Sequence, residues 1–116
     1  MALPLDDMYQ QGFQARANGD YGRARLFLES VLSQDPTHMN ARHQLGLIQG
    51  FEGDFDGSLA TLRSLSLQYP TNLGIKYDLA MTAMMLGETD LGCQMLNEIL
   101  AVDPTHDDAL RQSIYC

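Results

Sequence analysis

Three prolines at a constant interval constrain the fold of this 116-residue chain more than any other feature. Pro36, Pro70 and Pro104 lie 34 residues apart, and a threonine follows each of them. A proline pushes the residue before it out of the α region, so it marks the end of a helix. The threonine, or the residue after it, can cap the helix that follows. A fixed period of this length indicates an internal repeat of one structural unit.

A second mark falls in the middle of each period. Gly19, Gly53 and Gly87 are again 34 residues apart, and an acidic residue follows each glycine. Glycine tolerates the left-handed conformation at a helix end, and the acidic residue suits the positive N-terminal end of the next helix. Apolar residues between these marks recur at three-to-four spacing. We therefore expect two helices per period, at roughly residues 5–18 and 21–34, 38–52 and 55–68, and 72–86 and 89–102.

Several positions inside the period make the chain resemble the tetratricopeptide repeat (TPR) family over about residues 5–104. The family has small residues midway along the first helix and early in the second, which let the two helices approach closely. These positions, and the large apolar position that follows them, hold Gly12, Gly46 and Ala80, then Ala24, Ser58 and Gly92, then Leu28, Leu62 and Leu96. The chain departs from the family at the first-helix aromatic position, which holds Met8, Arg42 and Lys76.

The resemblance implies an all-α fold, an α-solenoid of antiparallel helix hairpins that forms a right-handed superhelix. We expect one domain over residues 1–116, with three TPR-like repeats at about 5–38, 39–72 and 73–106 and a partial capping helix at 107–116. A solenoid needs a polar-faced cap at its ends, and this last helix is short for one. Either a longer array continues beyond it, or a second copy covers the end and forms a homodimer.

The charge and the two cysteines limit the choice of partner and compartment. A formal net charge of −8 repels polyanions, so we expect neither nucleic acid nor an anionic membrane as a partner and favour basic or neutral ones. No apolar run approaches the ~20 residues of a membrane-spanning helix, and residues 1–7 lack a signal-peptide pattern. Cys93, expected as a small core residue of a second helix, and Cys116 do not form a disulfide pattern. These features predict a reducing, cytoplasmic location.

Residue patterns that carry catalytic or metal chemistry are not found in the sequence. The best near-match to a calcium loop is Glu52, Asp54 and Asp56, but Arg63 stands where the loop needs a glutamate. This segment therefore reads as a solvated turn between helices. His38 and His106 follow Pro-Thr at equivalent helix starts and look like matching surface positions. We expect no enzyme activity, no cofactor and no metal site.

The family resemblance also implies which residues face a partner, because the first helix of each hairpin lines a concave groove. Carried over position by position, the groove residues are Tyr9, Phe13, Arg16, His43, Leu47, Tyr77, Met81, Met84 and Arg111. Residues that share one helical face in this way are neighbours in space. The carboxylate clamp of chaperone-binding relatives is missing from this set. Tyrosine and methionine side chains replace it, and they offer large, adaptable contact area.

We therefore expect a protein-interaction module or scaffold, in the manner of an adaptor or chaperone, that binds an apolar peptide segment with basic flanks. The same apolar residues could instead be ordinary packing between adjacent hairpins. Two other readings stay open at this point. The chain could be a self-assembling, dimerising repeat domain, or a targeting domain cut from a larger multi-domain protein such as a transferase.

Overall fold

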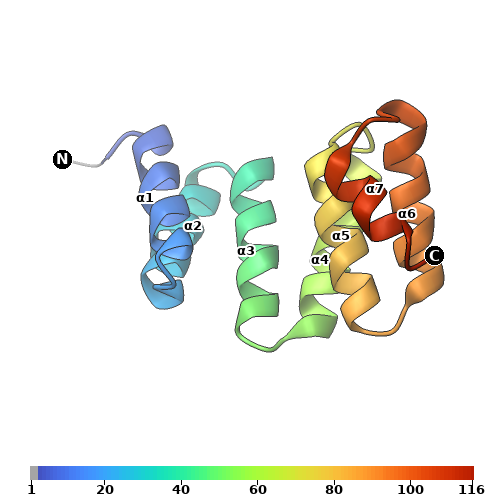
Figure 1. The fold of residues 1–116 in the computed structure, drawn as a ribbon. Helices are drawn as coiled ribbons and strands as arrows, with labels where there is room; N and C mark the ends of the chain where they lie inside the picture. Colours follow the sequence, from blue (N-terminus) through green and yellow to red (C-terminus); the bar gives the residue numbers. More distant parts are fainter. Residues whose placement is uncertain (1–2) are drawn as a thin grey trace. The chain divides into compact units, whose positions relative to one another are not determined.

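The computed structural model describes residues 3–116, so the first two residues of the predicted domain lie outside it. The described residues are helical, without strands (Figure 1). The helices are α1 (Leu5–Ala17), α2 (Tyr21–Gln34), α3 (Met39–Phe51), α4 (Phe55–Gln68), α5 (Leu73–Met85), α6 (Thr89–Val102) and α7 (Asp107–Ser113). The bounds of the first six agree with the sequence prediction to within one residue at each end. The chain divides into two compact units, Met1–Ser58 and Leu59–Cys116, and the division falls within α4.

The glycines at mid-period end the first helix of each pair, as predicted. Gly19, Gly53 and Gly87 have φ angles of 81°, 93° and 79°, a left-handed conformation that favours glycine. The acidic residues that follow two of them start the next helix. Asp20 accepts a hydrogen bond from the backbone N–H of Arg23, and Asp54 accepts one from the N–H of Gly57.

The residue after the proline–threonine pair, and not the threonine, caps the following helix. His38 and His106 each accept a hydrogen bond through Nδ1 from a backbone N–H three residues on, at 3.0 and 3.1 Å. Asn72 does the same through its side-chain oxygen at 3.0 Å. The threonine hydroxyls of Thr37 and Thr105 donate instead to Asp35 and Asp103. The cap thus recurs in all three turns between repeats, whereas the threonine–aspartate hydrogen bond recurs only in the first and third, because Tyr69 replaces the aspartate in the second.

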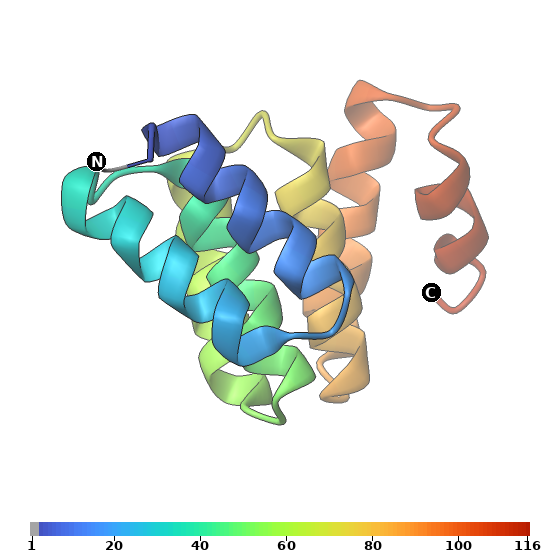
Figure 2. The same ribbon diagram turned by 90° about the vertical axis from the view of Figure 1, so that its left-hand side faces the viewer.

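In the first unit, α1 and α2 pack side by side as an antiparallel hairpin (Figure 2). A Cβ atom added to Gly12 would lie 2.8 Å from Cγ of Leu28, so the helices meet where a larger residue does not fit. Met8, at the family's aromatic position, is buried in this core. The core residues of this unit are Met8, Ala15, Ala24, Leu28, Val31, Ala41 and Ile48.

In the second unit, α5 and α6 form the matching hairpin. A Cβ atom added to Gly92 of α6 would lie 3.2 Å from the carbonyl oxygen of Ala80 and would collide with the side chain of Met84 on α5. The predicted small positions therefore serve close helix approach in both units. The buried apolar residues of the second unit include Leu62, Leu65, Ile75, Leu79, Ala80, Ala83, Leu96, Ile99 and Ala109.

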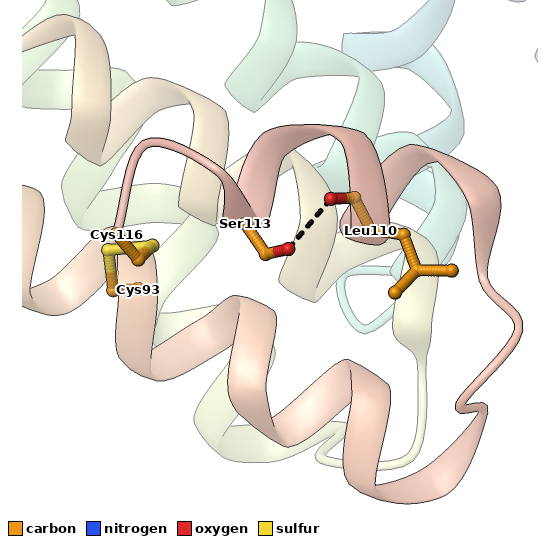
Figure 3. Close-up of a disulfide and its surroundings, with 4 residues drawn as sticks. All are labelled: Cys93, Leu110, Ser113 and Cys116. Carbon is orange, nitrogen blue, oxygen red and sulfur yellow. Dashed lines mark hydrogen bonds between the residues drawn. A yellow bond between two sulfur atoms is a disulfide. The ribbon is translucent and has the colours of Figure 1, made fainter.

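Helix α7 packs against α6, and the chain then turns back so that Cys116 bonds to Cys93 (Figure 3). The prediction of two separate thiols is wrong. Cys93 is also not a core residue, because its side chain is only half-buried on α6. The turn after α7 brings the two Cα atoms to 5.8 Å, within the range that a disulfide spans.

The disulfide removes the redox argument for a reducing compartment, because such bonds persist where the surroundings are oxidising. The length and apolar content of the helices give a separate result. Within residues 3–116, no helix combines the length and the hydropathy that a bilayer crossing requires.

Candidate functional site

In the first unit, three of the predicted groove residues lie next to one another on α1. The ring centroids of Tyr9 and Phe13 lie 6.3 Å apart, and the guanidinium of Arg16 lies 5.1 Å from the centroid of the Phe13 ring. The ring of His38, at the start of α3, lies 5.3 Å from that of Tyr9. All four side chains are half-buried. We call these four residues the Tyr9 cluster.

Polar atoms around the Tyr9 cluster are only partly satisfied. The side-chain amide of Gln44 hydrogen-bonds the Tyr9 hydroxyl, while burial of the ring raises the pKa of Tyr9 above its ordinary value. The Oε1 atom of Gln44 and the Nε atom of Arg16 are buried without a hydrogen-bond partner. Buried groups of this kind are uncommon in folded proteins. An acceptor and a donor thus remain without hydrogen-bond partners beside an aromatic surface.

The two predicted residues on α3, His43 and Leu47, are half-buried, and α1 and α3 are in contact. Gln44 and His38 were not predicted from the sequence as members of the site. Gln44 lies between the two predicted α3 positions in sequence, next to His43. Its burial, to 6% exposure, is unusual for a glutamine and reflects its contact with Tyr9.

The second unit repeats this arrangement around Tyr77. The ring centroid of His106, which caps α7, lies 6.0 Å from that of Tyr77. Burial raises the pKa of Tyr77, the negative charge of Asp108 raises it further, and Arg111 opposes the shift. Arg111 itself is exposed and pairs with Asp108. We call Tyr77, His106, Asp108 and Arg111 the Tyr77 cluster.

The two methionines predicted on α5 differ in their surroundings. Both are half-buried, but Met84 packs against Gly92 of α6 and so contributes to the hairpin itself. Met81 lies one helical turn after Tyr77 on the same helix. Of the α5 residues selected from the sequence, Tyr77 and Met81 thus remain the candidates for contact with a partner.

A tyrosine on a first helix therefore meets the histidine that caps the next first helix in both units. A signal for this pairing is present in the sequence, because Tyr9 and Tyr77 are separated by the same two periods as His38 and His106. The equivalence of the two histidines was predicted, but their contact with the tyrosines was not. The pair combines a capping function with an aromatic contact.

A separate cleft of about 220 Å³ lies in the second unit, among residues of α4, α5 and α6. The Nζ atom of Lys76 forms an ion pair with Oε1 of Glu98 at 3.0 Å at this cleft. The Lys76 side chain is only 10% exposed, whereas that of Glu98 is 42% exposed. Lys76, at the family's aromatic position, is therefore buried and ion-paired within the second unit.

In the acidic turn that resembles a calcium loop, two of the acidic side chains make contacts within the protein. Glu52 pairs with Arg25, and Asp54 caps α4 through the N–H of Gly57. Among residues 3–116, no group of three or more histidine, cysteine or acidic side chains is placed to hold a metal ion.

Comparison with known proteins links this architecture to solved structures. No protein-family model and no curated protein matches the sequence. YrrB, described as a TPR protein with an unusual peptide-binding site, is 21% identical with a TM-score of 0.81, and the match covers 96% of this chain and 57% of YrrB. A mutant O-GlcNAc transferase from Thermobaculum terrenum is 21% identical with a TM-score of 0.85, covering 97% of this chain and 22% of the transferase.

A third structure has a similar length. PcrH, solved in complex with the chaperone-binding region of PopB, is 17% identical with a TM-score of 0.77, covering 94% of this chain and 90% of PcrH. The chain spans less than two thirds of YrrB and of the transferase. These matches define an all-helical repeat protein. The chain has the tetratricopeptide repeat fold, as its sequence pattern predicts.

Proposed function

We propose that the chain is a protein-interaction module that binds a peptide segment of a partner protein through the concave groove predicted from its sequence. The residues proposed to make contact are the Tyr9 cluster in the first unit, and Tyr77, Met81 and Arg111 in the second. The proposal rests mainly on one observation. Half-buried aromatic side chains occupy the same repeat position in both units, with polar groups at their edges.

Such side chains suit peptide recognition for physical reasons. Tyrosine offers a large, rigid contact area together with a hydroxyl that can hydrogen-bond, and methionine adapts its shape to the ligand. Two of the three structures compared above are described as binding peptides or a chaperone-binding region, which supports the same class of function. The net charge of −8 favours a peptide with basic residues beside its apolar ones.

A selection from a displayed library of random short peptides tests the proposal. A selected peptide is then titrated into the parent protein and into a Tyr77→Ala, Met81→Ala variant, with calorimetric detection. We expect the variant to lose roughly 1–3 kcal/mol of binding free energy, the range of aromatic hot spots. The variant Tyr9→Ala tests the first unit in the same way.

The matched control is Leu26→Ala on α2, a second helix. Leu26 is large, apolar and exposed, so this variant removes a similar surface away from the first helices. A peptide that binds the parent, the double variant and Leu26→Ala equally well would reject the first-helix surface as the site. Circular dichroism of each variant shows whether its helices are intact.

A second candidate function is self-assembly through the C-terminal end. Ile114 and Tyr115 are 78% and 69% exposed, and Leu110 beside them is also exposed. A homodimer would cover these side chains. Sedimentation of the parent and of an Ile114→Lys, Tyr115→Lys variant over a range of concentrations tests this candidate. A parent that stays monomeric at every concentration removes it.

Two further expectations accompany the proposal. The module is expected to have no catalytic activity of its own, although one of the compared structures is a transferase many times its length. The disulfide favours an oxidising compartment, whereas the cytoplasm predicted from the sequence would keep both thiols reduced.

A further inference from the structure

The last helix is short and buries little apolar surface. Helix α7 has seven residues, and Ala109 is its one buried residue. A helix of this length is not stable in water on its own. The bond between Cys93 of α6 and Cys116 closes the far end of the segment that carries α7 (Figure 3). Leu110 points away from the bond in this view and is exposed.

Helix α7 and its capping residue nevertheless supply three neighbours of Tyr77. The ring of His106 at its start contacts the Tyr77 ring, and Asp108 and Arg111 act electrostatically on the Tyr77 hydroxyl. If α7 left α6, Tyr77 would lose these three neighbours at once. Tyr9 has its own histidine partner, the cap of α3, and the disulfide does not involve that helix.

We infer that the Cys93–Cys116 disulfide is a redox latch, which keeps α7 docked and the Tyr77 cluster assembled, and that its reduction releases α7. The consequence for peptide binding rests on the function proposed above, because Tyr77 and Arg111 belong to the proposed contact surface. The structural part of the inference, release of α7, does not depend on any ligand.

The reaction needs a dithiol as reductant. One thiolate of the dithiol attacks a sulfur of the disulfide and forms a mixed disulfide, and its second thiolate then displaces the remaining cysteine. Cys93 and Cys116 together gain two electrons and two protons, and the dithiol becomes a disulfide. Because Cys116 is exposed, the bond is open to a reductant from solvent.

Two measurements on the intact chain test the latch, with dithiothreitol as the reductant. Amide hydrogen exchange reports on α7, and NMR spectra of labelled tyrosine rings report on Tyr77, with Tyr9 as the internal control. Mass spectrometry confirms the disulfide before reduction through the loss of two hydrogens. On reduction we expect exchange in α7 to accelerate by about 30-fold to a few hundred-fold, since loop-closure entropy for a separation of 23 residues corresponds to roughly the upper value. The Tyr77 signals should move, and those of Tyr9 should stay.

The variant Cys116→Ser removes the bond without a reductant and changes only an exposed residue. It should reproduce the spectrum of the reduced parent under oxidising conditions. Unchanged protection of α7 after reduction would overturn the latch. Loss of protection throughout α5 and α6 would also overturn it, because the bond would then support the whole second unit and not α7 alone. Neither result would bear on whether the protein binds peptides.

Discussion

The ring of Tyr9 lies against the ring of His38, with centroids 5.3 Å apart, while Nδ1 of the same histidine caps helix α3. One side chain thus connects the first helix of a repeat to the beginning of the next. Tyr77 and His106 form the same connection in the second unit. The pairs place an aromatic surface at the same repeat position each time, and they also stabilise the turn between repeats.

Replacing His38 by alanine should lower the free energy of unfolding. The substitution removes the cap of α3, which costs about 0.5–2 kcal/mol, and also the contact with Tyr9. The matched variant is His38→Asn, because Asn72 caps α5 at the equivalent position. We expect asparagine to recover the capping part of the loss in urea unfolding experiments. If alanine and asparagine behave alike, the cap contributes nothing measurable.

Adding a single methyl group at Gly12 should lower the stability of the protein. The Cβ atom of Gly12→Ala would meet the side chain of Leu28 at 2.8 Å, so we expect a loss of about 1–3 kcal/mol. The control is Gly22→Ala, where the added atom has no neighbour within 4 Å. There alanine should be neutral or stabilise by up to about 1 kcal/mol, because it restricts the unfolded chain. Equal effects at both positions would contradict the close approach of α1 and α2.

The ion pair of Lys76 and Glu98 should respond unequally to removal of its two members. In Glu98→Ala the buried ammonium loses its partner, and we expect a loss of about 1–3 kcal/mol. In Lys76→Met an apolar chain of similar length fills the site, and the partly exposed Glu98 loses its ion pair while its Oε2 atom stays buried, so the loss should be smaller than in Glu98→Ala.

The double variant Lys76→Met, Glu98→Ala serves as the control for this pair. It should recover most of the stability lost in Glu98→Ala, because no buried charge remains. Thermal or urea unfolding of the four proteins measures the effect. A Lys76→Met variant that is less stable than Glu98→Ala would show that the ammonium makes a further stabilising contact.

Stability should also decrease in alkaline solution, in part through Tyr9. Burial raises the pKa of Tyr9 in the folded protein above the ordinary 10.0, so the unfolded chain loses its proton first. The resulting stabilisation is complete below pH about 10 and is lost as the pH rises through the folded value. Urea unfolding between about pH 9 and 12 should therefore show a smaller decrease for Tyr9→Phe than for the parent. The same decrease in both proteins would show that Tyr9 does not ionise differently in the two states.

The sequence predicts the helices well because its strongest signals act locally. Pro36, Pro70 and Pro104 and the glycines midway between them act on the backbone at their own positions, and their spacing needs no knowledge of the fold. The small residues Gly12 and Gly92 are also predicted, because the family pattern places small residues where the two helices of a hairpin approach closely. These local rules determine the first six helices to within one residue.

The remaining features depend on contacts between residues far apart in sequence. Cys93 and Cys116 are separated by 23 residues, and only the turn after α7 brings them together. Lys76 and Glu98 meet because α5 and α6 pack closely, and a lysine at an aromatic position gives no indication of an acidic partner. The contact surface is predicted residue by residue, but the contacts of His38 with Tyr9 and of His106 with Tyr77 become visible only in three dimensions.

The methionine ε-methyl NMR spectrum, recorded with and without a selected peptide, tests the central claim most directly. Met81 lies on the proposed contact face of α5, whereas Met95 is buried on α6 and serves as the reference within the same unit. We predict that the peptide moves the Met81 signal and leaves that of Met95 in place. A peptide that binds and moves the signal of Met95 but not that of Met81 would contradict a first-helix binding surface.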